Sequence, residues 1–392
     1  MKYLSVLLLI FSLGCGKDED EQVELDDESP TINCPEDISV TIEFLDPSPI
    51  IEYDEPTVTD NVGAVASLRS GQASGTAFPD GETTVTYRAQ DAAGNTTSCS
   101  FTVSVVRNEP TTLNEPYVIG GLTVTGKKWS PVTELSDEFE GSEINTDVWD
   151  TRSVVPGRFF WYGRWPGLFR KKNIIVQNGE LWLTAEILDT PIDSGNVEGW
   201  THGGSIVRSH VDAQIGMFVE AEMKTTETIF SGTFWLTSPS ADCNVVPNTE
   251  LDVTESIGRK SGVFKQPELG WYRNAADEFE FGINSTCRQR GSSCLDPKNS
   301  GNSIGDFVPS EDFHVYGMYW RSPTEIDFYL DGTYAYTIEP PIAFENPMAI
   351  IMACETYDFN WPTDAESDGF NLSREQRSSR YKWVRTWKLE DE

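Results

Sequence analysis

The chain has 392 residues, with 29 lysines and arginines against 63 aspartates and glutamates, which gives a formal net charge of −34. This length is ample for a sizeable core and indicates more than one domain. The charge balance argues against nucleic-acid binding, because phosphate contacts need a basic surface. Only three histidines occur, His202, His210 and His314, and they are scattered, so we expect no catalytic transition metal.

Residues 1–15 have the pattern of an export signal. Lys2 gives a charged start, residues 4–13 are mostly apolar, and small residues precede Cys15. The apolar run is too short to span a bilayer. The end of the segment resembles a bacterial lipoprotein box, which implies that Cys15 is lipidated and attaches the protein to the outer membrane or cell surface. Ser12 stands where leucine is commoner, so ordinary signal cleavage and secretion is the alternative.

Residues 16–30 form an acidic tether that begins with Lys17-Asp18-Glu19-Asp20-Glu21. Low hydrophobicity and like charges predict a segment that does not fold by itself. Similar acidic segments accompany surface display in Bacteroidetes-type lipoproteins. A plain disordered tether is the simpler interpretation.

Short strand-like runs, such as residues 38–42 and 84–87, alternate with turn clusters at 60–61 and 80–81. This spacing predicts a small antiparallel, immunoglobulin-like β-sandwich over residues 31–107. Cys34 and Cys99 bracket the segment, and we predict that they form a disulfide, as suits an exported chain. The four remaining cysteines allow three connectivities, among which the sequence does not select: Cys243, Cys287, Cys294 and Cys354.

This module resembles the hyalin repeat, or HYR, domain. The resemblance rests on Cys34-Pro35, on residues 56–61, 78–87 and 89–95, and on Cys99-Ser100-Phe101. We interpret the module as a spacer, because it contains no tryptophan that could form a platform for sugars. Residues 108–128 then form a linker to a second domain at 129–392.

The sequence of the second domain has strand-like runs throughout and no long amphipathic helical pattern, which predicts an all-β jelly roll of two stacked sheets. All twelve tryptophans lie at or after Trp129, as suits stacking on sugar rings. Asn178-Gly179 predicts a turn between two strands. Residues 203–208 and 216–224 fit two paired strands, the second with Glu220, Glu222 and Lys224 pointing outward.

Three acids lie within Glu250-Leu251-Asp252-Val253-Thr254-Glu255, in a run that otherwise reads as a strand. Strand side chains alternate, so the second glutamate falls on the wrong face. One extra residue inserted as a bulge, at Val253 or Thr254, would return it to the face of the other two acids. Like charges close together disfavour full ionisation, which helps to keep one glutamate protonated near neutral pH.

An exposed, solvated strand is the alternative interpretation of these acids, but their surroundings argue against it. A strand-like run at 231–237 precedes them, and Phe313-His314-Val315-Tyr316-Gly317 and Phe328-Tyr329-Leu330-Asp331-Gly332 follow. Together these motifs resemble glycoside hydrolase family 16, whose signature is Glu-x-Asp-x-x-Glu. The resemblance implies Glu250 as nucleophile, Glu255 as general acid and base, and Asp252 as the residue that orients them.

The loop Trp161-Tyr162-Gly163-Arg164-Trp165-Pro166 resembles the marine galactan-cutting members of that family, which are agarases, porphyranases and carrageenases. It implies that Trp161, Arg164 and Trp165 contact the sugar, although a lone arginine in a loop is more often plain surface. Three further residues are candidates for substrate contacts, namely Trp235 and Trp361 by stacking and Arg259 by holding an anionic sugar group.

The sequence thus predicts an exported, monomeric, retaining endo-β-glycosidase that hydrolyses a red-algal galactan such as agar, porphyran or carrageenan. A β-1,3-glucanase is the alternative within the same chemistry, and a non-catalytic carbohydrate-binding or adhesion protein is the alternative outside it. No cofactor is required. The abundant acids would permit a structural calcium, as in some relatives, but the sequence names no ligands for one.

Overall fold

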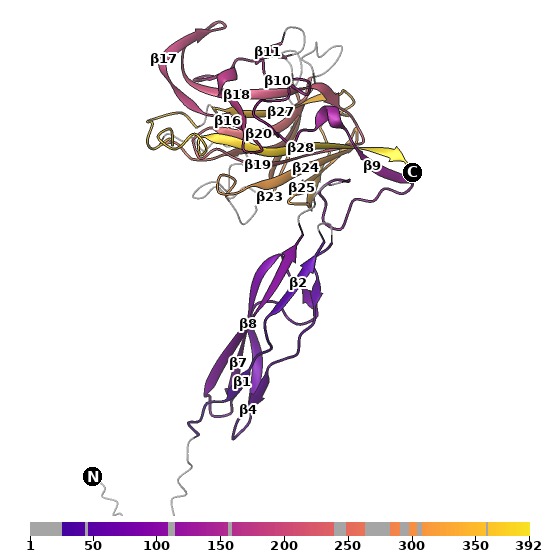
Figure 1. Ribbon diagram of the computed structural model, residues 1–392, viewed down its shortest axis with the longest axis vertical. Coiled ribbons are helices and arrows are strands. Elements are labelled where there is room, and N and C mark those ends of the chain that lie inside the picture. The colour runs from indigo at the N-terminus through magenta and orange to yellow at the C-terminus, as the bar shows by residue number, and fades with distance from the viewer. Residues whose placement is uncertain are drawn as a thin grey trace, which may run out of the picture. The chain divides into compact units, whose positions relative to one another are not determined.

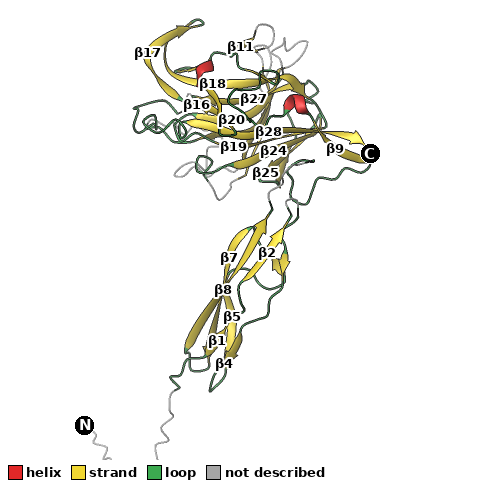
Figure 2. Ribbon diagram, viewed as in Figure 1, coloured by secondary structure: helices red, strands yellow, loops and turns green. Residues whose placement is uncertain are grey.

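The computed structural model describes residues 26–43, 46–108, 114–155, 159–238, 248–262, 283–290, 298–303, 308–357 and 360–392. These residues form strands and loops, with two single-turn 3-10 helices, η1 (Thr133–Leu135) and η2 (Lys171–Asn173) (Figure 2). The all-β prediction is confirmed. The export signal, Cys15 and most of the tether lie outside the described residues. Within the described ranges, no helix is long and apolar enough to cross a membrane.

The chain divides into two compact units, residues 1–43 with 48–108 and residues 44–47 with 109–392. The N-terminal unit is a small β-sandwich (Figure 1). One of its sheets has the order β2 (Ile38–Ile42), β8 (Thr96–Arg107), β7 (Gly81–Asp91), β5 (Ala64–Ser70). Two strand pairs complete it, β1 (Thr31–Asn33) with β4 (Thr57–Thr59) and β3 (Ile50–Ile51) with β6 (Thr76–Ala77).

A disulfide joins Cys34 to Cys99, as predicted. It borders a core of apolar side chains that includes Phe78, Val85 and Phe101. The prediction of a purely antiparallel sandwich was wrong in one respect, because β2 runs parallel to β8. No local sequence pattern predicts this parallel pairing, because it joins strands at the beginning and the end of the module rather than the two neighbouring strands of a hairpin.

The C-terminal unit consists of two large sheets. The first, which we call the inner sheet, has the order β13 (Gly163–Arg164), β14 (Gly167–Phe169), β18 (Val197–Ala213), β27 (Met348–Glu355), β20 (Ser231–Thr237), β21 (Asn248–Ile257), β22 (Ile283–Arg290), β23 (Lys298–Ser303). Strands β10 (Trp149–Asp150) and β17 (Glu186–Ser194) add to β18. A separate pair is formed by β11 (Val154–Val155) and β12 (Phe159–Phe160).

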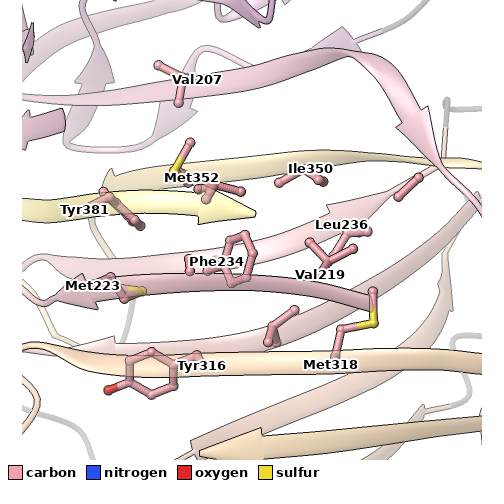
Figure 3. Close-up of a cluster of buried hydrophobic side chains, with 14 of the residues drawn as sticks. Val207, Val219, Met223, Phe234, Leu236, Tyr316, Met318, Ile350, Met352 and Tyr381 are labelled. Carbon is pink, nitrogen blue, oxygen red and sulfur yellow. The ribbon is translucent and has the colours of Figure 1, made fainter. Parts of the chain in front are cut away.

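The second, outer sheet has the order β15 (Ile174–Gln177), β16 (Glu180–Thr184), β28 (Ser378–Asp391), β19 (Met217–Lys224), β24 (His314–Ser322), β25 (Glu325–Leu330), β26 (Thr333–Ile338), and β9 (Lys127–Pro131) joins β28. Apolar side chains of the two sheets meet and form the main core. Figure 3 shows part of it, with Phe234, Leu236, Ile350 and Met352 from the inner sheet and Val219, Met223, Tyr316 and Met318 from the outer sheet. Burial of this area is the main driving force for the jelly roll.

Local turn chemistry was predicted better than strand pairing. The Asn178-Gly179 turn joins β15 to β16, and both residues have positive φ, 56° and 73°, as a tight hairpin turn requires. The prediction that 203–208 pairs with 216–224 was wrong, because β18 lies in the inner sheet beside β27 while β19 lies in the outer sheet. Cys354, one of the four cysteines whose pairing the sequence left open, is a free thiol buried in the core.

Glu220 was predicted to point outward, and it is completely buried. It does point away from the main core, but residues 117–124 cover this face of the outer sheet, where Val118 and Leu122 pack beside Trp129. The Trp387 indole donates to Glu220 Oε1 over 2.7 Å, and the backbone N–H of Tyr117 donates to Oε2 over 3.0 Å. The C-terminal part of the predicted linker therefore packs as part of the jelly-roll unit.

Candidate active site

The three acids of β21 share one face of the inner sheet. Alternate residues of β20 pair with them, Thr237 with Glu250, Trp235 with Asp252 and Thr233 with Glu255. Because alternate residues of a strand point the same way, their cross-strand partners also share a face. The register shifts between Phe234 and Trp235, which makes Val253 the extra residue. The bulge therefore lies at one of the two positions that the acid spacing predicts.

The apolar residues between the acids fix which way this strand faces. Leu251 and Val253 are fully buried in the core between the sheets. Glu250 and Asp252 point to the opposite face and are each only 6% exposed, while Glu255 is half-buried. Water is thus largely excluded from the first two carboxylates, which strengthens every charge interaction that they make.

Glu255 is held by a tyrosine that follows β27. The Tyr357 hydroxyl donates a hydrogen bond to Glu255 Oε1, and its ring is 5% exposed. A donor at one carboxyl oxygen fixes the orientation of the group and leaves proton exchange to the other oxygen. Tyr357 was not predicted from the sequence, because a lone tyrosine after a strand has no local pattern that relates it to an acid about a hundred residues earlier.

Arg164 is fixed beside this tyrosine. Its guanidinium carbon lies 4.6 Å from the centre of the Tyr357 ring and 5.6 Å from that of Trp161. Nη1 donates to Glu355 Oε2 and to the backbone carbonyl of Thr356, each over 2.9 Å. The Glu355 side chain is 4% exposed and that of Arg164 is 33% exposed. The structure therefore places Arg164 beside Tyr357, which binds Glu255, and holds it in a partly buried ion pair that the sequence did not predict.

The loop that carries Arg164 is built by close backbone packing. Gly163 has φ 122°, and a Cβ there would lie 2.2 Å from the carbonyl oxygen of Gly167, so only glycine fits. A Cβ at Gly167 would lie 2.9 Å from Thr356 Oγ1. The Thr356 hydroxyl in turn donates to the carbonyl of Arg164. These contacts fasten the loop to the end of β27, beside Tyr357.

The predicted stacking tryptophans lie in two pairs. Trp161 meets Trp235 edge to face, with ring centres 6.2 Å apart, and Trp235 is 8% exposed. Trp165 meets Trp361 at 4.7 Å, and Trp165 is 44% exposed, which leaves a large aromatic face toward solvent. Exposed aromatic faces of this kind are surfaces on which a sugar ring can stack. Stacking on substrate stays a prediction for all four residues.

Arg259 lies after β21 but points its guanidinium at protein carbonyls. Nε donates to the carbonyl of Glu227 over 3.1 Å, and Nη1 donates to that of Ser367 over 3.2 Å. This geometry favours a structural role, in which the arginine fastens two loops. A contact with an anionic sugar stays a prediction for this residue.

A second buried ion pair on β18 was not singled out from the sequence. Arg208, which is 3% exposed, lies 3.4 Å from Asp150 Oδ2, and Arg152 binds the same oxygen over 2.6 Å. Burial opposes ionisation of Asp150, but the hydrogen bonds and charge of Arg152 outweigh it and lower the pKa of Asp150 to about 2. Arg208 pairs with Ile351 and so shares its face of the inner sheet with the acids.

Comparisons with known proteins identify the families of the two units. Residues 129–389 match the family described as beta-porphyranase A–D, GH16 domain, and residues 25–105 match the HYR domain. Beta-porphyranase B of Zobellia galactanivorans is 36% identical over 272 residues, which cover 68% of this chain and 86% of that protein. Beta-porphyranase C of the same organism is 33% identical over 294 residues, with coverage of 68% and 79%.

The fold is shared as well. The crystal structure of porphyranase B from Zobellia galactanivorans superposes with a TM-score of 0.62 and 34% identity, and covers 71% of this chain and 100% of that one. The catalytic chemistry of these relatives is hydrolysis of glycosidic bonds. With its HYR domain followed by the matching jelly roll, this chain is a glycoside hydrolase that belongs to family 16, in the group of beta-porphyranase A–D domains.

Proposed function

We propose that this chain is a retaining, endo-acting β-galactanase with porphyran as its substrate. The observation that carries the proposal is the bulge at Val253, which puts Glu250, Asp252 and Glu255 on one face beside Trp235. The substrate is inferred from the relatives, several of which are named beta-porphyranases. Agarose and carrageenan are the competing galactans, and laminarin represents the β-1,3-glucan alternative.

In the proposed reaction, the Glu250 carboxylate attacks the anomeric carbon and forms a glycosyl ester, while Glu255 gives its proton to the departing glycosidic oxygen. Glu255 then takes a proton from water, which attacks the ester and restores Glu250 with overall retention of configuration. Asp252 lies between the two glutamates and orients them. No step requires a metal or another cofactor.

Tyr357 supports the role of Glu255 as the proton carrier. Its hydroxyl donates to Oε1, so we place the transferred proton on Oε2. Arg164 is paired with Glu355 and lies against the Tyr357 ring, so it helps to hold the tyrosine that binds Glu255. The two residues thus position the acid rather than react themselves.

We also propose that the protein acts at the cell surface as a monomer, attached to the outer membrane through lipidated Cys15. The HYR domain and the acidic segment before it then act as a spacer between the membrane and the polysaccharide. Metabolic labelling with a fatty-acid analogue tests this proposal, and a Cys15→Ser variant should lose the label.

The central experiment is incubation of the purified protein with porphyran, agarose, κ-carrageenan and laminarin, with sizing of the products. We expect porphyran to yield oligosaccharides, whose newly formed reducing ends have the β configuration by NMR immediately after cleavage. Glu250→Gln and Glu255→Gln should each lose at least about 1000-fold in kcat, because each removes a reacting group. Glu222→Gln, on the outer sheet, is the matched control and should keep full activity.

Each contrary result has a definite meaning. Degradation of laminarin alone would refute the galactan assignment. Binding of porphyran without cleavage, by a folded parent protein, would refute the catalytic proposal and favour a carbohydrate-binding role. Inverted configuration of the new ends would refute the double displacement.

A further inference from the structure

Three aspartates of the N-terminal unit converge from three separate parts of its sequence. Asp26 precedes β1, Asp60 lies in the turn between β4 and β5, and Asp91 ends β7. One carboxylate oxygen of each lies within 4.8 Å of one from each of the other two. In the part of the chain that the structure describes, no lysine or arginine forms an ion pair with any of the three. Three like charges therefore gather without a protein cation.

Donors from the surrounding turns hold these carboxylates in place. Asp91 Oδ1 accepts the backbone N–H groups of Gly94 and Asn95, over 2.6 and 2.8 Å, and the Asn95 amide donates to Oδ2. These three hydrogen bonds fix the position of the Asp91 carboxylate.

The other two aspartates each use one oxygen in the same way. Asp26 Oδ1 accepts from the Asn61 amide over 2.9 Å, and Asp60 Oδ2 accepts the N–H of Val62 over 3.0 Å. The remaining oxygens, Asp26 Oδ2 and Asp60 Oδ1, are buried, and within the described residues neither receives a hydrogen bond. A buried carboxylate oxygen without a donor is unfavourable unless a positive charge lies beside it.

From this arrangement we propose a calcium site in the N-terminal unit, formed by Asp26, Asp60 and Asp91. All three ligands are hard oxygen donors, with no histidine or cysteine, which favours Ca²⁺ over zinc or copper. Ca²⁺ binds oxygen at about 2.3–2.6 Å, so two ligands on opposite sides of it lie up to about 5.2 Å apart. The 4.8 Å limit on the separations fits that span.

The site would join the start of the module to two of its turns. Asp26 is the first described residue and lies in the C-terminal part of the predicted acidic tether, residues 16–30. Asn95 already connects the turn after β7 to Asp26, since its side-chain amide donates to the backbone carbonyl of Asp26 over 3.1 Å. Bound calcium would fix residue 26 against residues 60–62 and 91–95. Where the tether leaves the module would then depend on the calcium concentration.

Hydrogen–deuterium exchange on the purified full chain, with CaCl2 or with EGTA, tests the proposal at the site itself. We expect calcium to slow amide exchange at least tenfold in residues 60–63 and 91–95. Asp60→Asn should abolish this slowing. Asp54→Asn, the same change at an exposed aspartate outside the cluster, should respond as the parent does. Calorimetric titration should give one fewer calcium per chain for Asp60→Asn.

Two controls keep the result interpretable. Slow exchange in β7 and β8 without calcium verifies that Asp60→Asn is folded, and Asp26→Asn replaces it if it is not. Equal exchange with calcium and with EGTA in the parent would overturn the proposal, as would a calcium response in Asp60→Asn equal to that of the parent. Equal protection by MgCl2 at the same concentration would overturn the assignment to calcium.

Discussion

Glu220 offers a sharp test of the energetics of the outer sheet. Its carboxylate is fully buried beneath residues 117–124, where it accepts hydrogen bonds from Trp387 and Tyr117. Burial raises its pKa from an ordinary value of 4.5 to about 7, even though both hydrogen bonds favour the charged form. Glu220→Gln replaces this acid with a neutral group of the same size.

The sign of the pH effect follows from linkage. An acid whose pKa is raised by folding holds its proton more tightly in the folded chain than in the unfolded chain. Glu220 therefore does not lower the free energy of unfolding below about pH 4.5. As the pH rises from there, the free energy of unfolding falls, and the fall is complete above about pH 7. At about 1.4 kcal/mol per pH unit, the free energy of unfolding should fall by about 2–3 kcal/mol between pH 5 and pH 8.

The assay is urea unfolding at several pH values, followed by tryptophan fluorescence. All twelve tryptophans lie at or after Trp129, so the signal reports the jelly-roll unit alone. The informative quantity is the free energy of unfolding of the parent minus that of Glu220→Gln, because other titrating groups cancel. We expect this difference to fall by about 2–3 kcal/mol from pH 5 to pH 8.

Glu222→Gln serves as the control, since Glu222 lies two residues along the same strand, is only half-buried and pairs with Lys382. The fall between pH 5 and pH 8 should be specific to Glu220→Gln. A constant difference for Glu220→Gln would refute the argument, because it would mean that Glu220 keeps an ordinary pKa despite its burial. A difference that grows with pH would reverse the proposed sign.

Three further predictions concern the active-site unit. Tyr357→Phe should lower kcat about tenfold and move the alkaline limb of the pH–rate profile to higher pH, because loss of this hydrogen-bond donor disfavours the charged form of Glu255. An unchanged pH–rate profile would contradict this prediction. Arg164→Ala should lower the free energy of unfolding by about 1–2 kcal/mol, since it leaves Glu355 buried without its cation while Arg164 itself is partly solvated. Adding Glu355→Gln should restore part of that loss, and no restoration in urea unfolding would argue against the pair. Burial lowers the pKa of His202 to about 4, so as the pH falls this histidine is protonated in the unfolded chain before it is protonated in the folded chain. The free energy of unfolding should therefore fall as the pH drops from about 6.5 to about 4, and His202→Gln should reduce that fall in the same assay.

The sequence predicted the local geometry of the acids well. The spacing of Glu250, Asp252 and Glu255 conflicts with strand alternation, and one inserted residue at Val253 resolves the conflict. The Asn178-Gly179 hairpin was equally readable, because its turn type demands those residues. In both cases the deciding physics acts within a few residues of the chain.

Long-range features were not predictable in the same way. The burial of Glu220 depends on residues 117–124, about a hundred positions away, and strand alternation alone places it in solvent. Tyr357 and Glu355 approach the active site only because β27 lies between β18 and β20 in the sheet. A local pattern does not encode which strands become neighbours, so the support around the acids required the structure.

The Cys34–Cys99 disulfide and the parallel pairing of β2 with β8 also have a mechanical consequence for the N-terminal unit. Tension along the chain enters before Cys34 and leaves after Arg107, and the Cys34–Cys99 bond carries it directly into β8. The loop closed by that bond, which contains β2, is shielded from the load as long as the bond is intact. After reduction the load would pass through the start of β2 and the end of β8, which lie at opposite ends of the parallel pair, so their hydrogen bonds would be strained together in shear rather than broken one at a time. The residues of the loop would become extensible only once those hydrogen bonds had broken.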